Sequence, residues 1–157
     1  MTMNPPITAE NYAPVTIQHR APTVSLPAVR GMLGLTSVAV VRMIEDGRLS
    51  WAFNIAARDA TRADYRVLAL CIADYQRGVI HPVSWSEVLR LLYGHPRAAI
   101  HSSYFYRAWA CRSDHFYALL GEGALEVVSP DWRCGPAGGA YVTWDSAVAF
   151  AKRCRVA

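Results

Sequence analysis

The stretch GLTSVAVVRMIEDGRL, residues 34–49, decides the fold that the sequence predicts. Thr36 is placed to cap a helix that ends near Asp46, because a Ser/Thr hydroxyl accepts a hydrogen bond from an unpaired amide of the first turn. Gly47 follows, as glycine does where a helix ends in the left-handed conformation. The helix carries three apolar residues at helical spacing, and that face is expected to be buried: Val40, Met43 and Ile44.

The flanking residues complete one unit over 24–77. A preceding helix is predicted over 26–33, with Ser25 as its cap and a break at Gly34. After the deciding stretch, alternating apolar residues predict a strand over 49–55. Thr61 and Asp64 have the spacing of a capping box, which predicts a closing helix that reaches about Gln76.

The same order returns 76 residues later, over 101–157. Helices are predicted over about 103–110 and 113–122, strands over 125–128 and 140–143, and a last helix over 144–153. The shift aligns small residues with small and core residues with core: Gly34 with Ala110, Val40 with Phe116, Met43 with Leu119, Ile44 with Leu120, Gly47 with Gly123, and Leu49 with Leu125. A glycine-rich loop over 130–139 stands where the first unit has its polar loop.

Two further segments lie outside the repeat. Residues 1–23 hold four prolines and no periodic apolar pattern, which predicts a flexible N-terminal arm. Residues 78–100 are predicted to be a helical connector. Its helix, over 85–93, starts at a capping box formed by Ser84 and Glu87.

Composition limits the function classes. The chain has 157 residues, a hydrophobic fraction of 53% and a net charge of +4, which is compatible with nucleic acid without demonstrating it. Its apolar runs, such as Val67–Ala73, are far shorter than the roughly 20 residues that span a bilayer, and no signal-peptide pattern starts the chain. We therefore expect a cytoplasmic protein without a membrane partner.

The sequence predicts neither a metal, a cofactor nor an enzymatic activity. Four cysteines occur without a C-x-x-C pair, and free thiols packed as small apolar residues are the expectation. A metal site from Cys111, His115, Cys134 and Cys154 is the alternative. The sequence contains no phosphate-binding glycine loop, nucleophile elbow or zinc-protease motif.

Residues 34–49 resemble the turn, second helix and first wing strand of the MerR/excisionase class of winged helix-turn-helix proteins, which includes phage excisionases and AlpA-like regulators. Residues 110–125 are similar, although Arg112 stands where the class has a Ser/Thr cap, and residues 141–150 resemble the wing strand and closing helix. The resemblance implies a mainly α fold with small β wings, built from two winged helix-turn-helix units in tandem.

The function that follows is sequence-specific binding of double-stranded DNA. The resemblance implies a transcription regulator or an excisionase-like recombination directionality factor of a phage or mobile element. The second helix of each unit would enter a major groove, and the wings would contact adjacent backbone. The candidate DNA-binding residues are Thr36, Ser37, Ala39, Val41, Arg42, Arg58, Arg62, Arg112, Ser113, His115, Tyr117 and Arg133.

A second interpretation comes from the apolar outer face of the first unit. Val38 and Val41 lie on the side of the helix that would face the groove, and an exposed apolar surface also suits a protein partner. The alternative function is therefore a protein-interaction adapter with degenerate winged-helix units. Whether copies of the chain associate with one another stays open at this point.

Overall fold

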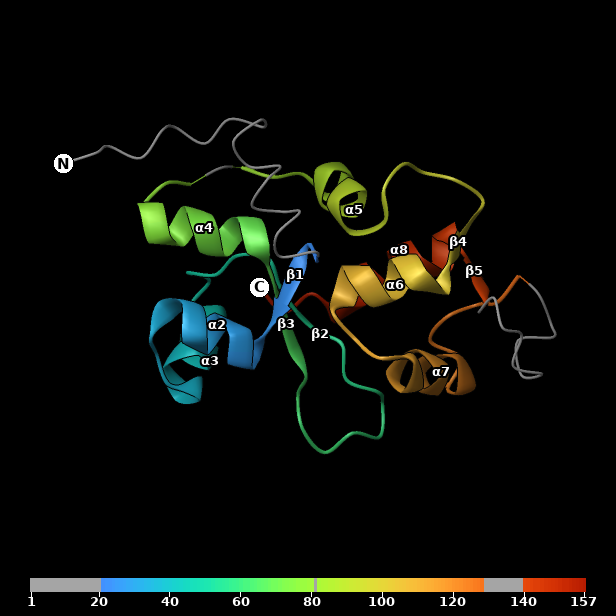
Figure 1. Ribbon diagram of the computed structural model, residues 1–157, viewed down its shortest axis with the longest axis horizontal. Coiled ribbons are helices and arrows are strands. Elements are labelled where there is room, and N and C mark those ends of the chain that lie inside the picture. Colours follow the sequence, from blue (N-terminus) through green and yellow to red (C-terminus); the bar gives the residue numbers. More distant parts are fainter. Residues whose placement is uncertain (1–20, 81, 129–139) are drawn as a thin grey trace.

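Seven helices and two small antiparallel sheets make up the described part of the chain, which is residues 21–80, 82–128 and 140–157 of this computed structural model (Figure 1). The expectation of a mainly α fold with small β elements is confirmed. Most of the predicted N-terminal arm and the glycine-rich loop over 130–139 lie outside the described residues.

We call the first group of elements unit one. It comprises β1 (Thr23–Ser25), α2 (Leu26–Leu33), α3 (Ser37–Glu45), β2 (Ala52–Asn54), β3 (Tyr65–Leu68) and α4 (Ala69–Arg77). Its three strands form an antiparallel sheet in the order β1-β3-β2. Val67 of the central strand lies opposite Val24 on one side and Ala52 on the other, and all three are buried.

Helix α5 (Trp85–Tyr93) connects unit one to a second group of elements. This unit two comprises β4 (Ala99–His101), α6 (Ser102–Trp109), α7 (Ser113–Gly121), β5 (Tyr141–Thr143) and α8 (Trp144–Cys154). Strand β4 pairs with β5, and Val127 adds an isolated bridge to Val142. The predicted strand over 125–128 is therefore reduced to one bridge.

The 76-residue shift holds for the backbone as well as for the sequence. Helices α6 and α7 begin 76 residues after α2 and α3. Gly34 and Ala110 end the first helix of each pair in the left-handed conformation, with φ of 66° and 47°. After the second helix, Gly47 and Gly123 again have matching φ values of 76° and 79°. The two units therefore share one backbone path through the helix pair.

The predicted helix from Thr61 to Gln76 is wrong over its first half. Residues 65–68 form β3, and α4 begins only at Ala69. Asp64 does not complete a capping box, because its amide donates to Asn54 Oδ1 at 2.9 Å. Pairing with strands on both sides satisfies the backbone of β3, and this tertiary contact outweighs the local capping signal.

Smaller differences from the predictions concern the helix caps and the ends of one strand. Ser25 lies in β1, and its side chain makes no capping hydrogen bond to α2. The strand expected over 49–55 is only the three residues of β2. The caps at Thr36 and Ser84 are confirmed, and Thr143 caps α8 in the same way. Each hydroxyl accepts from an amide of the first turn at 3.2 Å.

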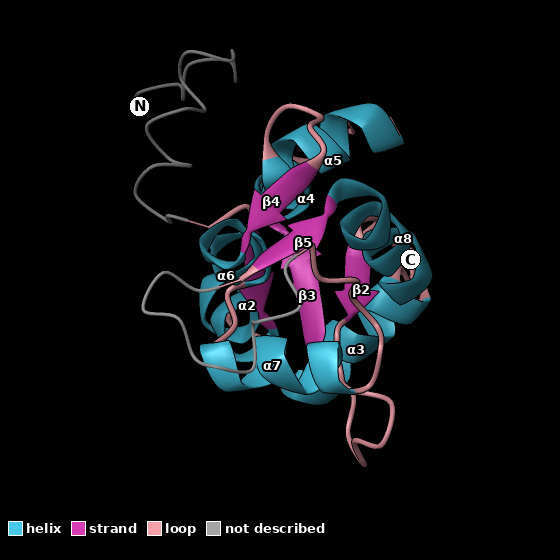
Figure 2. Cartoon of the chain, turned by 90° about the vertical axis from the view of Figure 1, so that its right-hand side faces the viewer, coloured by secondary structure: helices cyan, strands magenta, loops and turns pink. Residues whose placement is uncertain are grey.

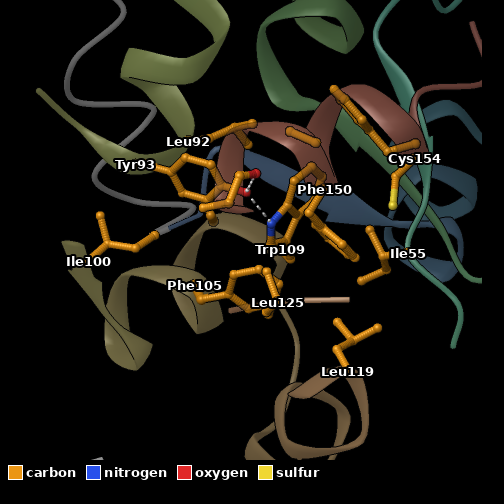
Figure 3. Packing of buried hydrophobic residues seen from close by; sticks show 14 of the residues in the cluster. Ile55, Leu92, Tyr93, Ile100, Phe105, Trp109, Leu119, Leu125, Phe150 and Cys154 are labelled. Atoms are coloured by element: carbon orange, nitrogen blue, oxygen red, sulfur yellow. Dashed lines mark hydrogen bonds between the residues drawn. The ribbon is translucent and has the colours of Figure 1, made fainter. Parts of the chain in front are cut away.

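The main hydrophobic core crosses from one unit to the other. Trp109 of α6 is fully buried, and its ring lies 5.0 Å from that of Phe53 in β2 and 5.7 Å from that of Phe150 in α8. Its indole Nε1 donates to the buried hydroxyl of Tyr93 in α5 at 3.1 Å (Figure 3). A second cluster packs α2 and α3 onto the sheet of unit one. Units one and two are therefore joined by shared interior packing.

Among the described residues, no single helix is long and apolar enough to cross a membrane. Helices α2 and α3 reach the required length and composition only when taken together, and their axes are bent by 101° at the turn between them.

Candidate nucleic-acid interface

Helices α2 and α3 have the geometry of a helix-turn-helix pair. They are joined by a three-residue turn and cross at 101°, within the range of about 90–120° that is typical of the motif. Thr36 Oγ1 accepts from the amide of Ala39 at 3.2 Å, which fixes the start of α3. The amides of Ser37 and Val38 precede the first intrahelical hydrogen bonds, so this end of α3 carries partial positive charge.

The face of α3 that points away from the core holds the residues predicted for the first unit. Val40, Met43 and Ile44 are buried on the inner face. On the outer face Thr36 and Arg42 are exposed, while Ser37, Ala39 and Val41 are half-buried. Val38 is the most open apolar residue of α3, with 70% of its surface exposed.

Helix α7 occupies the equivalent place in unit two, but fewer of its predicted residues face solvent. Arg112 and Ser113 are exposed at its start. His115 points toward unit one, where its Nε2 lies 2.7 Å from the carbonyl oxygen of Ile55. Tyr117 is half-buried, with its ring 5.4 Å from that of Phe116. The side chains of His115 and Tyr117 therefore contact other residues of the same chain.

The loop between β2 and β3, residues 55–64, lies where the sequence predicts the wing of unit one, and we call it the wing. Asn54 Oδ1 closes it by accepting from the amides of Ala56 and Asp64, at 3.1 and 2.9 Å. Arg58 and Arg62 are exposed on it. Arg133, predicted for the wing of unit two, lies outside the described residues.

Helices α3 and α7 and this wing lie on one side of the molecule. In Figure 1 the wing projects between α3 and α7 at the lower edge, and in Figure 2, turned by 90°, all three are again lowest. Helices α4 and α5 lie above them in both views. We call this side, formed by α3, the wing and α7, the lower face.

Acids slightly outnumber cations on the lower face and the residues next to it. The five cations are Arg42, Arg48, Arg58, Arg62 and Arg112, and the six acids are Glu45, Asp46, Asp59, Asp64, Asp114 and Glu122. Three of the acids lie beside an arginine: Asp46 is 3.2 Å from Arg48, Asp114 is 3.9 Å from Arg112, and Asp64 pairs with Arg66. Within the part of the chain that the structure describes, the side chains of Arg42, Arg58 and Arg62 form no ion pair. These three guanidinium groups are therefore available to a partner.

A buried arginine that the sequence analysis did not single out joins the two units behind this face. Arg66 of β3 has only 7% of its surface exposed, and its Nε donates to the carbonyl oxygen of Trp109 at 2.6 Å. Its Nη1 pairs with Asp64 and its Nη2 donates to the carbonyl oxygen of Ala110 at 3.3 Å. No sequence signal marks this role, because an arginine in a short alternating strand normally faces solvent.

The cysteines within the described ranges have the properties of packed thiols. Burial raises the pKa of Cys111 and of Cys154 to about 11, and also raises the pKa of Cys71. Among the described residues, no three His, Cys, Asp or Glu side chains are placed to hold a metal ion. Cys134 lies outside those ranges. A scan against models of protein families, a search of curated proteins and a search of solved structures found no match for this chain.

Proposed function

We propose that this chain binds double-stranded DNA in a sequence-specific manner through two tandem winged helix-turn-helix units. It would act as a transcription regulator or as an excisionase-like recombination directionality factor, the roles that its resemblance to the MerR/excisionase class implies. The observation that carries the proposal is the position of α3 and α7. They are equivalent helices of two repeated helix pairs, and they lie on the same face with a wing between them.

Helix α3 is the proposed base-reading helix of unit one. Its N-terminal amides and the Ser37 hydroxyl would contact a backbone phosphate, to which a helix N-terminus is attractive. Arg42 lies about one and a half turns further along the exposed face and would donate to the O6 and N7 of a guanine. A bidentate contact of this kind discriminates against other bases by about 1–3 kcal/mol. Val38 offers an apolar contact to a thymine methyl group.

The wing and α7 supply the remaining contacts in this proposal. Arg58 and Arg62 would contact phosphates or enter the adjacent minor groove. At the start of α7, Arg112 would donate to a guanine edge in the next major groove, and Ser113 would contact a phosphate. His115 would support the wing through its contact with Ile55 in place of reading a base.

The test is a salt series with fluorescent duplex DNA, followed by anisotropy. Four arginines are placed on DNA in this proposal: Arg42, Arg58, Arg62 and Arg112. At one displaced counterion each, the slope of log affinity against log salt is about −3.6, or about a 100-fold loss between 50 and 200 mM. Arg58→Ala should weaken all sequences alike and reduce the slope by about 1. Arg42→Ala should reduce the preference for a selected site by about 10-fold or more.

Arg90→Ala is the matched control. Arg90 is an exposed arginine on α5, which lies away from the lower face (Figure 1). Its removal changes the net charge by the same amount as the other two substitutions. If all three variants bind DNA equally, or if wild-type affinity does not depend on salt, the lower face is not a DNA-binding surface.

A protein-interaction adapter is the second candidate, and two observations favour it. Val38 is 70% exposed, and the lower face carries five cations against six acids. A protein partner would bind this face with little dependence on salt, and Val38→Ala would remove an apolar contact from its centre and greatly weaken its binding. DNA binding predicts that the same substitution weakens DNA affinity only moderately, since Arg42 and the wing remain.

A further inference from the structure

We infer that units one and two bind DNA as a single rigid body, so that the target is a two-part site whose halves stand at one fixed spacing. This inference rests on the proposed function. It differs from the behaviour of two modules on a flexible tether, in which the linker lets each unit find its own half-site.

The first support is the way unit one caps a helix of unit two. The last carbonyl groups of a helix have no intrahelical partner. At the end of α6, the Ala108 carbonyl oxygen accepts from Thr23 Oγ1 at 2.7 Å, and the Trp109 carbonyl oxygen accepts from Arg66 Nε at 2.6 Å. Both donors belong to the sheet of unit one. Because Thr23, Arg66 and Trp109 are all buried, a change in the angle between the units would break hydrogen bonds that water does not replace.

The second support is the contact between α7 and the wing. His115 Nε2 lies 2.7 Å from the Ile55 carbonyl oxygen at the start of the wing. At the other end of α7, Glu122 Oε2 accepts from the Arg58 amide at 2.8 Å. The reading helix of unit two is therefore bonded to the wing of unit one at both ends, which fixes the separation of the two elements on the lower face.

The third support is the shared sheet edge and core. Residues 155–157 follow α8 and run beside β2. The Val156 amide donates to the Ala52 carbonyl oxygen at 2.9 Å, and the Ala52 amide donates to the Ala157 carbonyl oxygen at 3.2 Å. The guanidinium of Arg155 lies 3.5 Å from the ring centroid of Trp51. Together with the Phe53–Trp109 contact, these interactions place unit two against both the edge and the inner face of the unit-one sheet.

The two kinds of linkage respond differently to the distance between half-sites. With a flexible tether, one or two added base pairs change the effective concentration only slightly, because it falls slowly with the length to be spanned. With a rigid body, the second unit cannot reach a displaced half-site. The gain in affinity that comes from binding two linked half-sites, typically about 100-fold or more, is then lost with the first inserted base pair.

The experiment uses the full chain and a site selected from a random duplex pool. Insertions of 1, 2, 5 and 10 base pairs are placed between the two halves of the selected site, and equal insertions outside the halves serve as controls. Arg42→Ala and Arg112→Ala, each footprinted on the selected site, identify which half each unit contacts. We expect one inserted base pair to reduce affinity about 100-fold, to the level of an isolated half-site, with no recovery at 10 base pairs.

Three outcomes overturn the inference while leaving DNA binding intact. These are a loss smaller than about threefold across the insertions, recovery when one helical turn is added, and a selected site with only one half. Failure to select any DNA, with no salt-dependent binding, instead overturns the proposed function on which the inference rests.

Discussion

Replacing Arg66 with methionine should reduce the free energy of unfolding by about 3 kcal/mol. Methionine has similar length and is apolar, so the volume of the site is largely kept while every hydrogen bond of the guanidinium is lost. The carbonyl of the fully buried Trp109 would lose its 2.6 Å partner, at a cost of about 2 kcal/mol. The carbonyls of Tyr65 and Ala110 are closer to solvent and would contribute about 0.5 kcal/mol each.

This loss is a large part of the total stability of about 5–15 kcal/mol that a domain of this kind has. The assay is urea unfolding followed by tryptophan fluorescence, for which the chain has five tryptophans. Arg66→Lys should be intermediate, since one ammonium group cannot donate to all of these carbonyls at once. Arg90→Met, at an exposed position, should change stability by less than about 0.5 kcal/mol. A loss below about 1 kcal/mol for Arg66→Met would refute the reasoning that this arginine caps α6.

Three other predictions test the end of α6, the cap of α3 and the burial of two cysteines. Ala110→Gly should stabilise the chain by about 0.5–1 kcal/mol and raise its melting temperature by a few degrees, because Ala110 has φ of 47° where unit one has Gly34; an unchanged or lower melting temperature would contradict this. Thr36→Ala should lower the free energy of unfolding in urea by about 1 kcal/mol and weaken DNA binding, since it removes the cap of α3. An unchanged free energy of unfolding would show that the Thr36 hydroxyl does not stabilise the helix. Burial raises the pKa of Cys111 and Cys154 to about 11, so the folded chain holds these protons more tightly than the unfolded chain. The midpoint of urea unfolding should therefore be constant up to about pH 9 and fall as the pH rises toward 11. This fall should be smaller in a variant with both cysteines replaced by alanine.

The helix pairs could be predicted from the sequence because their signals are local. The cap at Thr36, the buried stripe that follows and the glycine at position 47 lie within one short segment, and each is confirmed by the structure. Helices over about 103–110 and 113–122 were expected, and α6 and α7 lie there. The left-handed end at Ala110 was not predicted, because glycine is the residue that normally marks this conformation.

Strand β3 could not be predicted in the same way. The spacing of Thr61 and Asp64 suggests a helix start, and nothing nearby in the sequence contradicts it. The strand exists because β1 and β2 lie on either side of it, and β1 is more than 40 residues away along the chain. A helix ending at about Gln76 was expected and α4 ends at Arg77, so the error is confined to where the helix begins.

The residues of the candidate site also differ in whether local sequence predicts their position. The outer face of α3 follows from helical periodicity, and Arg42 and Val38 are exposed as that periodicity requires. The orientation of His115 depends on a contact with Ile55, 60 residues earlier, which periodicity does not encode. The role of Arg66 depends likewise on where α6 ends in space.

The pairing of residues 155–157 with β2 has a consequence for synthesis on the ribosome. Arg155 emerges about 100 residues after Asn54, which at about 5–20 residues per second is an interval of roughly 5–20 seconds. During that interval the outer edge of β2 lacks its backbone partner, and the ring of Trp51 lacks the guanidinium of Arg155. A nascent chain in this state exposes both an open strand edge and aromatic surface, which are the features that chaperones bind and that favour association between incomplete chains.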